Sequence, residues 1–560
     1  MPAKKKPSHS QNKILTALPI IIILICAIIL RLVFFTGMVR GDDINYSHAA
    51  YELSQGRTHF DYWQAGTSRI GLYGPVALLY VVFGTSEPVT LAFPFISSIF
   101  TVLIMFGIGS LLDGRRTGLL AALLWACLPL DIFLASDLLP DGPLATFTAA
   151  AILFLLLAER NKPPQKVRWI FMSAIFLVWA ILIKPTAIIT LIFFLIYWAY
   201  KLWPRLYSQP FVRRTLVWIS RYRQLPIYTG VFLMFFLGIT YSQFQNRPLV
   251  VSLGRTATDL SRVFLTGETG TDYGVQRPGQ IDMFAVLGFL FLISAAALAL
   301  RGYKPARFAL LNGAVYFLYY EWGSVGLNPL TYSPIVNVDE RNLLFLLVPF
   351  LLLVAIHLST ELSDRQAERI VNVVAGLVSL TVLTFGGRLI SGQYSNEFEF
   401  IKLIAIIAFL IIPLTLQSLH ASNRWLPVGF LSLFVCFALL KPTSPFDPLT
   451  WKTRREEISS FRQAADYLKN QDGRVYIASY GEALRLNYAS NFNLGFEWAE
   501  GGTLGTGNKI LVGLPQSLGA GGFYVSSNEL MDPAEELQEV YRTTQPGRPL
   551  IIYFAPLGNG

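Results

Sequence analysis

Charged residues are scarce in this 560-residue sequence. They make up 14% of the chain, whereas hydrophobic residues make up 53%, and the mean hydropathy is +0.48. An ordinary soluble domain carries charge on about 25% of its residues. The shortage of charge therefore argues against a soluble globular protein and predicts a polytopic α-helical membrane protein.

Cysteine is almost absent, and negative charge is the rarer sign. The three cysteines, Cys26, Cys127 and Cys436, each lie in an apolar run without a CxxC or Cys/His pairing, so we expect no disulfide framework and no structural zinc. The net charge is +10 at pH 7. No soluble basic domain is present to bind nucleic acid, and membrane proteins concentrate Lys and Arg in their cytoplasmic loops, which accounts for the excess.

The chain contains many long apolar runs. The first covers about residues 14–35 and follows Lys4–Lys6; it is too long for a signal peptide and no small-residue cleavage site follows, so we expect an uncleaved first span. Each run must form a helix, because lipid cannot satisfy free backbone groups. The pattern predicts about thirteen crossings. The other runs lie near residues 88–112, 118–134, 143–158, 168–183, 185–203, 227–243, 282–300, 307–322, 342–358, 370–387, 400–418 and 425–441.

The distribution of Lys and Arg predicts the orientation. With the tail 1–13 in the cytoplasm, the inner loops and the tail together hold roughly 20 Lys and Arg, about twice the number in the outer loops. This arrangement places the loop 36–87 outside, where the apolar piece 72–80 is too short to cross and should form an interfacial helix. It also places residues 442–560 outside the membrane, after a transmembrane domain that covers 14–441.

Residues 442–560 have the pattern of a small soluble α/β domain. Apolar residues recur at helical spacing over 454–470, and a second helix is expected over 482–488. Residues 474–478 and 550–554 are mostly apolar and rich in β-branched and aromatic side chains, as in strands. The alternation of strands and helices predicts an α/β unit, but no motif within it indicates a chemical role.

The stretch 41–53 directly follows the first apolar run and begins with two acids, Asp42 and Asp43. The residues after them have the spacing of a short helix that ends at Gly56. Such a pair can simply meet water at a helix end. The alternative is catalytic: adjacent carboxylates repel, so one pKa rises and that group becomes a better base near neutral pH. We place Tyr46 and His48, on the same helix, among the substrate-binding residues, although a lone His is more often structural.

Three further groups occupy predicted outer helix ends. Asp137 and Asp141 flank a turn, where acids can also serve as helix caps. Lys184 precedes Pro185 between two apolar runs, and it can either snorkel to lipid headgroups or pair with a phosphate. Arg341 stands at a helix start, which is unfavourable unless an anion is near; a local salt bridge is the alternative.

Taken together, these groups resemble the GT-C glycosyltransferases, in particular the protein O-mannosyltransferases and the bacterial lipid A aminoarabinose transferases. The sequence Asp42–Tyr46 is similar to the acidic signature of their first outer loop. Pro140–Asp141 resembles their second acidic loop, Lys184–Thr186 their Lys-containing break, and Arg341–Leu344 their Arg-Tyr-Leu-Leu helix start. The resemblance covers about residues 14–360. The chain departs from the pattern at Asp43, where the family has Glu, and at Asn342, where it has Tyr.

The resemblance implies an enzyme that takes a sugar from a polyprenyl-phosphate-linked donor and transfers it, with inversion, to a hydroxyl of a glycolipid, glycan or protein outside the inner membrane. Asp42 would act as the base, with Asp43 as a second catalytic acid. Lys184 and Arg341 would stabilise the leaving phosphate. Asp43 and Asp141 would hold the acceptor, sugar hydroxyls or a metal, and metal dependence stays open.

Two other classes are compatible with a polytopic chain. A lipid or glycan transporter or flippase would place ionisable residues near mid-membrane, often within inverted repeats. A non-catalytic envelope-assembly protein would need no acid pair at a helix exit. Here the ionisable groups lie at predicted helix ends and no repeat is found, which favours transfer.

Overall fold

The structure is a computed structural model that describes residues 9–38, 41–57, 69–206, 302–322, 344–359, 448–477, 479–497, 503–504, 510–512, 521–527, 537–544 and 549–555. The chain divides into two compact units. The first contains residues 1–30, 99–131 and 144–441, and the second contains residues 31–98, 132–143 and 442–560. The predicted runs near 227–243, 282–300, 370–387, 400–418 and 425–441 lie outside the described residues.

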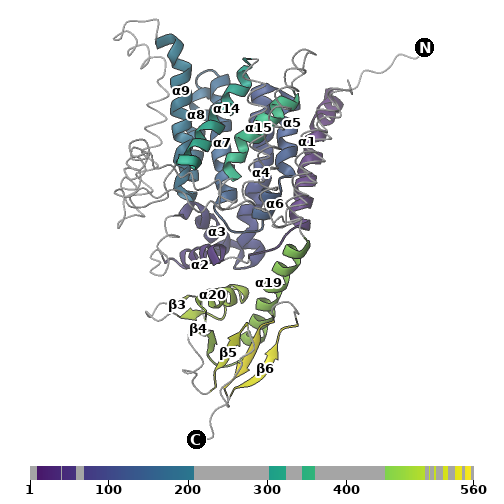
Figure 1. The fold of residues 1–560 in the computed structure, drawn as a ribbon, viewed down its shortest axis with the longest axis vertical. Coiled ribbons are helices and arrows are strands. Elements are labelled where there is room, and N and C mark those ends of the chain that lie inside the picture. Colours follow the sequence, from purple (N-terminus) through teal and green to yellow (C-terminus); the bar gives the residue numbers. More distant parts are fainter. Residues whose placement is uncertain are drawn as a thin grey trace, which may run out of the picture. The chain divides into compact units, whose positions relative to one another are not determined.

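The described part of the first unit is helical, and in Figure 1 its helices run nearly parallel. In chain order the helices that lie wholly or mainly in it are α1 His9–Val33, α4 Glu87–Asp113, α5 Arg115–Ala126, α7 Asp141–Arg160, α8 Gln165–Ile183, the 3-10 turn η1 Pro185–Ala187, α9 Ile188–Leu206, α14 Lys304–Trp322 and α15 Leu344–Ser359. Within the described residues, α4, α7 and α8 are long and apolar enough to cross a membrane. Shorter apolar helical stretches occur at 17–33, 70–83, 185–201 and 344–357.

The predicted run 118–134 is wrong as a single helix. The structure has two helices there, α5 and the short α6 Pro129–Leu134, separated at Cys127 and Leu128. Pro129 explains the break, because a proline restricts the residue before it and cannot donate a helical hydrogen bond. The hydropathy pattern is continuous across this break, so the pattern alone did not indicate it.

Small residues and one partly buried polar network hold the ends of helices in the first unit together. A Cβ added at Gly109 of α4 would lie 2.8 Å from the Cα of Gly118 of α5, so the two backbones pack in direct contact. At the end of α4 the Asp113 carboxylate accepts hydrogen bonds from Thr117 at 2.9 Å and from Ser359 at 2.8 Å, and also from the Tyr303 hydroxyl. This network joins the ends of α4, α5, α14 and α15.

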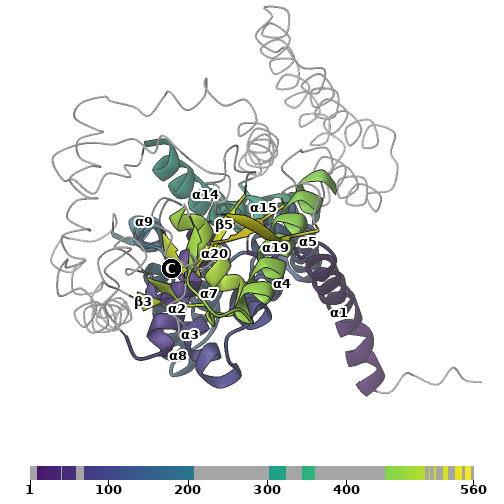
Figure 2. The same ribbon diagram turned by 90° about the horizontal axis from the view of Figure 1, so that it is seen from below.

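The second unit combines two short helices of the first loop with the C-terminal segment. The loop helices are α2 Gly41–Ser54 and α3 Ile70–Phe83, and the C-terminal helices are α19 Pro448–Lys469 and α20 Tyr480–Ala489. Helix α2 packs against α3 and α20, and α20 packs against α19 (Figure 2). The predictions of a short helix over 72–80 and of helices over 454–470 and 482–488 are confirmed, with longer bounds in each case.

The C-terminal segment contains a seven-stranded mixed sheet (Figure 1). Its order is β3-β2-β4-β1-β5-β7-β6. The strands are β1 Val475–Ile477, β2 Phe496–Glu497, β3 Thr503–Leu504, β4 Ile510–Val512, β5 Phe523–Ser526, β6 Gln538–Arg542 and β7 Ile551–Phe554. The central strands β1, β4 and β5 pair in parallel, and β5, β7 and β6 pair antiparallel.

The core of the sheet follows from its apolar strands. Val475 and Ile477, on one face of β1, and Ile551 of β7 are fully buried, whereas Tyr476 on the other face of β1 is half-buried. Gly473 lies just before β1 at φ +140°, and a Cβ there would stand 2.5 Å from the carbonyl oxygen of Gly521, so only glycine allows this approach. The two predicted strands are confirmed as β1 and β7.

Candidate functional site

Helix α2 gives the two adjacent acids opposite surroundings. Asp42 is exposed, whereas the side chain of Asp43 is completely buried and its Oδ1 accepts a hydrogen bond of 2.8 Å from the backbone N–H of Ile44. Successive helical residues point about 100° apart, so one faces solvent and the other the interior. The helix ends at Ser54, and Gly56 follows at φ +79°. The sequence-predicted end at Gly56 is thereby confirmed.

Tyr46 anchors the same helix to α3. Its ring is buried, and its hydroxyl accepts a hydrogen bond from the guanidinium of Arg69, the residue that precedes α3. The Arg69 guanidinium carbon also lies 5.4 Å from the centre of the Tyr46 ring, in a cation–π contact. Arg69 was missed by sequence reasoning, since nothing in its local pattern indicates a partner 23 residues earlier.

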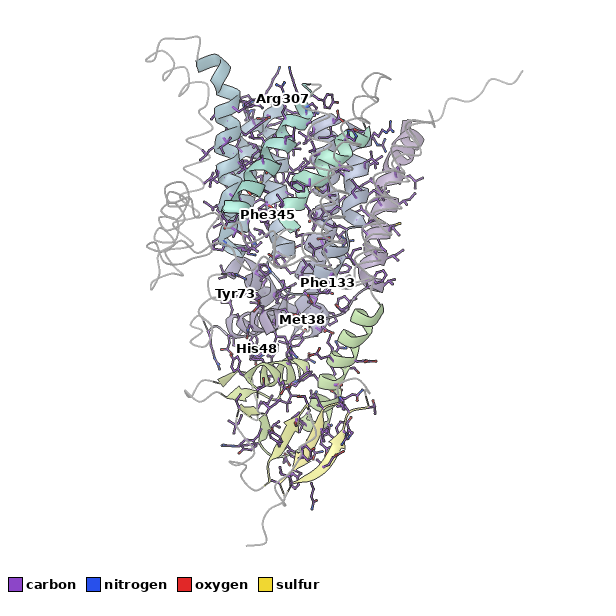
Figure 3. All side chains as sticks on the ribbon, viewed as in Figure 1. Met38, His48, Tyr73, Phe133, Arg307 and Phe345 are labelled. Carbon is purple, nitrogen blue, oxygen red and sulfur yellow. The ribbon has the colours of Figure 1, made fainter. Side chains whose placement is uncertain are left out.

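His48, labelled in Figure 3, joins α2 to the C-terminal segment. Its Nε2 lies 3.2 Å from the carbonyl oxygen of Leu484 in α20. Because a carbonyl oxygen only accepts, Nε2 carries the proton and Nδ1 does not. The side chain is fully buried, and this burial lowers the pKa of His48 to about 4, only partly offset by the Leu484 carbonyl. His48 is therefore a neutral imidazole at neutral pH.

Phe492 occupies a socket of aromatic rings that surrounds this histidine. Its ring stacks on Tyr51 of α2 at 4.4 Å between centroids and meets His48 edge-on at 5.0 Å. Tyr80 of α3 and Tyr488 of α20 complete the socket at 6.2 and 6.1 Å. Phe492 and its neighbour Asn491 have φ values of +63° and +55°, an unusual conformation for a bulky residue. The surrounding rings hold the backbone in this conformation.

Tyr488, a buried residue of the C-terminal segment, interacts electrostatically with the buried carboxylate of Asp43. The pKa of Tyr488 is raised well above its usual value, first by complete burial and then by the negative potential of Tyr80 and Asp43. The charge of Asp43 therefore acts on a residue of α20, which lies more than 400 positions later in the sequence. Sequence reasoning did not assign Tyr488 to the site, because its helix carries no recognisable motif.

The turn 136–141 belongs to the same unit. Asp137 and Asp141 are both buried, and the Ser136 hydroxyl lies 2.8 Å from that of Thr36, which follows α1. Arg31, near the end of α1, is buried as well and donates to the Ser98 hydroxyl in α4. Arg31 was not among the predicted site residues. It is the one charged residue inside the first apolar run. A single charge within an apolar run is usually functional, so the sequence could have indicated Arg31 as a site residue.

The second unit contains a polar cavity of about 390 Å³, which lies between the segment after α1, the start of α4 and helix α19. Glu87 and Arg462 form an ion pair at its wall, and Glu87 Oε1 is buried without a hydrogen-bond partner in the described part of the chain. The remaining lining residues are Phe35, Thr36, Glu456, Ile458 and Ser459. Hydroxyls, carboxylates and a guanidinium together suit a polyhydroxylated molecule.

The other predicted site residues are placed differently. Lys184 is half-buried at the end of α8 in the first unit, with an extended backbone (φ −154°) between the helix and η1, as the break at Pro185 predicts. Arg341 lies outside the described residues. The structure thus brings Asp42, Asp43 and the α2 residues together within one unit, and the convergence of all four predicted groups stays a prediction.

No group of three or more His, Cys, Asp or Glu side chains is arranged to hold a metal ion in the ranges that the structure describes. His48 is among the residues searched, and its Nε2 is engaged with Leu484. Metal dependence therefore stays open.

Comparison with known proteins gives a sequence match to part of the chain and a structural match along nearly all of it. The sequence pattern of the family of dolichyl-phosphate-mannose-protein mannosyltransferases matches residues 76–220. No curated protein matches the chain by sequence. Residues 76–220 include the later part of α3 and all of α4 to α9, with the buried turn 136–141 and Lys184.

Two crystal structures of ArnT from Cupriavidus metallidurans share the fold along nearly the whole length. The apo structure is 13% identical, with a TM-score of 0.56 over 98% of each chain. The structure bound to undecaprenyl phosphate is 13% identical, with a TM-score of 0.54 over 97% of this chain and 99% of that chain. The apo oligosaccharyltransferase of Archaeoglobus fulgidus matches at 13% identity and a TM-score of 0.45, over 91% of this chain and 69% of that chain.

The chain is thus a helical membrane protein with the fold of ArnT and a C-terminal sheet. Its central sequence follows the mannosyltransferase pattern. Both findings confirm the resemblance to the GT-C superfamily of membrane glycosyltransferases.

Proposed function

We propose that this protein transfers a single sugar from a polyprenyl-phosphate-linked donor to a hydroxyl group of a glycolipid, glycan or protein, with inversion at the anomeric carbon. The observation that carries the proposal is the acid pair of α2: one carboxylate is exposed and its neighbour is buried, directly after the first apolar helix. The shared fold supports the donor class, because one ArnT structure holds undecaprenyl phosphate.

Asp42 is the base in this proposal. A general base must reach the proton that it takes, and Asp42 is the accessible member of the pair. It removes the proton from the acceptor hydroxyl while that oxygen forms a bond to the anomeric carbon. The bond between the anomeric carbon and the phosphate oxygen breaks, and the electron pair leaves with the lipid phosphate.

Asp43 and the residues around it hold Asp42 in place. The buried carboxylate of Asp43 accepts from the Ile44 N–H at the first turn of α2, where the helix dipole favours negative charge. Tyr46 and His48 fix the helix to α3 and α20. Asp141 serves substrate binding, and Lys184 and Arg341 neutralise the charge that develops on the leaving phosphate.

The proposed reaction takes place outside the cytoplasmic membrane. The support is the Lys and Arg distribution, which predicts a cytoplasmic tail 1–13, a transmembrane domain 14–441 with about thirteen crossings, and an external segment 442–560. Reporter fusions after Arg214 and after Gly560 should report opposite sides of the membrane. The same side for both would contradict this topology.

Product analysis tests the function itself. A strain that lacks the protein should lose one single-sugar decoration from its glycans or lipids and accumulate a polyprenyl-linked sugar. Complementation with the wild-type chain should restore the decoration, and an Asp42→Asn chain should not. An Asp472→Asn chain is the matched control, because Asp472 is an exposed acid of the C-terminal segment. An unchanged glycan and lipid profile in the deletion strain would argue for a transporter or an assembly protein.

A further inference from the structure

The first unit contains a second cavity, which the proposed reaction does not use. It has a volume of about 620 Å³ and lies between the ends of α4, α7 and α9 and the beginning of α14. Ligand pockets in proteins usually measure about 300–1,000 Å³. Figure 3 shows Arg307, one of its lining residues, at the start of α14. The cavity is therefore large enough for a small ligand or a lipid headgroup.

One wall of the cavity is already neutral. The Glu159 carboxylate of α7 lies 2.5 Å from the ammonium of Lys201 of α9 and accepts a hydrogen bond of 3.0 Å from the Tyr197 hydroxyl. The Lys201 ammonium also lies 4.6 Å from the centre of the Tyr197 ring. Because Glu159 and Lys201 neutralise each other through these contacts, neither contributes a net charge to the binding of a ligand.

The other three cations of the lining have no carboxylate partner in the part of the chain that the structure describes. Arg160 donates to the carbonyl oxygen of Leu111 at the end of α4, and Arg307 donates to the Tyr200 hydroxyl at 3.3 Å. Lys304 is exposed. With Glu159 balanced by Lys201, the cavity keeps three positive charges.

The position of two of these cations is unfavourable without an anion. Lys304 is the first residue of α14 and Arg307 is in its first turn, which holds no acid. The positive end of a helix dipole repels cations. Arg160, in contrast, is in the last turn of α7, where a cation is favoured. The dipole and the two side chains of α14 therefore all attract the same negatively charged group.

The rest of the wall is apolar. Leu112, Leu156, Phe308 and Leu311 line it from three helices. A free inorganic anion gains nothing from such a wall, whereas an acyl or isoprenyl chain buries apolar surface against it at about 25 cal/mol per Å². Helix ends of a membrane protein also lie at the depth of lipid headgroups.

We propose that this cavity binds the phosphate group of an anionic lipid, with Lys304, Arg307 and Arg160 around the phosphate. The leucines that line the cavity then contact the first part of the lipid's hydrocarbon chain. The site is separate from the acid pair of α2. It would hold a lipid whether or not the protein transfers a sugar.

The test is lipid binding by the full-length protein, purified in detergent and stripped of native lipid. Native mass spectrometry measures titrations with dioctanoyl-phosphatidylglycerol, dioctanoyl-phosphatidylcholine and inorganic phosphate. Both lipids carry a phosphate, but the choline ammonium of phosphatidylcholine neutralises it and is repelled by the three cations, so the wild-type chain should prefer phosphatidylglycerol by about tenfold or more. The double variant Lys304→Gln/Arg307→Gln should lose this preference.

The matched control is Arg115→Gln/Arg116→Gln, which removes two exposed cations from the start of α5 outside the cavity. It should keep the preference, as should Lys304→Arg. An equal loss in the control variant, or no preference in the wild type, would overturn the proposal in favour of nonspecific attraction to headgroups. Inorganic phosphate binding as tightly as phosphatidylglycerol would overturn the lipid assignment. Thermal unfolding of each variant identifies any that is misfolded; if the double variant is misfolded, the single variant Lys304→Gln decides the test and should weaken the preference.

Discussion

The ring of Phe492 lies flat on that of Tyr51, with 4.4 Å between centroids and 12° between planes. These two residues are 441 positions apart in the sequence, and their contact joins the C-terminal segment to the helix that carries Asp42 and Asp43. The left-handed backbone at Asn491 and Phe492 aims the ring into the socket. The contact therefore couples the C-terminal segment to the candidate base.

Truncating this ring should loosen the second unit. Phe492 is buried, and removing a buried phenyl ring costs roughly 3–5 kcal/mol. Phe492→Ala should therefore lower the unfolding temperature of the unit and expose the segment 448–555 to proteases. The matched control is Val540→Ala, an exposed strand position, which should stay within about 0.5 kcal/mol of wild type. Equal protease resistance in Phe492→Ala and wild type would mean that the ring does not anchor the segment.

His48 should make the stability of the second unit depend on pH. Burial lowers the pKa of His48 to about 4 in the folded state, against 6.5 for a free histidine. Between these values the unfolded chain binds more protons than the folded chain, so acidification favours unfolding. The contribution of His48 is fully present above pH 6.5 and is lost as the pH falls toward 4.

The measurement is chemical denaturation at a series of pH values for wild type and His48→Gln. The variant removes the titrating group, so the wild-type stability should fall more steeply than that of the variant between pH 6.5 and 4. Other acids titrate in both proteins and cancel in the comparison. Parallel curves would show that His48 does not remain neutral when folded.

Lys184 and Arg341 should act on the donor and not on the acceptor. A charge-assisted hydrogen bond to phosphate contributes roughly 1.5–3 kcal/mol, so Lys184→Ala or Arg341→Ala should weaken binding of the polyprenyl-phosphate donor by about tenfold or more. Donor binding is measured directly in detergent, with Lys162→Ala as an exposed control. Unchanged donor affinity in both variants would indicate that Lys184 snorkels and that Arg341 forms a local salt bridge.

Much of the fold follows from local patterns. The helix after the first apolar run was predictable because small and apolar residues share one of its faces, and Tyr46, Ala49 and Ala50 are indeed buried. Pro185 marks the break at Lys184, since proline cannot continue the preceding helix. The strands β1 and β7 consist of β-branched and aromatic residues, and they were found by composition.

The contacts that build the site were not predictable in the same way. Strands β2 and β3 contain two residues each, too few to show an alternating pattern. The pairing of His48 with Leu484, and of Phe492 with Tyr51, depends on the packing of distant segments and has no local sequence signal. The division of roles between Asp42 and Asp43 was predicted from helical geometry, but which of them is buried needed the structure.

The most direct test of the account is the turnover of Asp42→Asn beside that of Asp43→Asn. The Asn side chain keeps the size of Asp and removes the proton acceptor. A positioned base contributes about a hundredfold to ten-thousandfold to the rate, so Asp42→Asn should bind the lipid-linked donor normally yet turn over at least about a hundred times more slowly. Asp43→Asn should retain more activity, because Asp43 is buried and acts on the position of the helix. Near-normal turnover in Asp42→Asn with loss in Asp43→Asn would assign the base to Asp43, and near-normal turnover in both would contradict the glycosyltransferase mechanism.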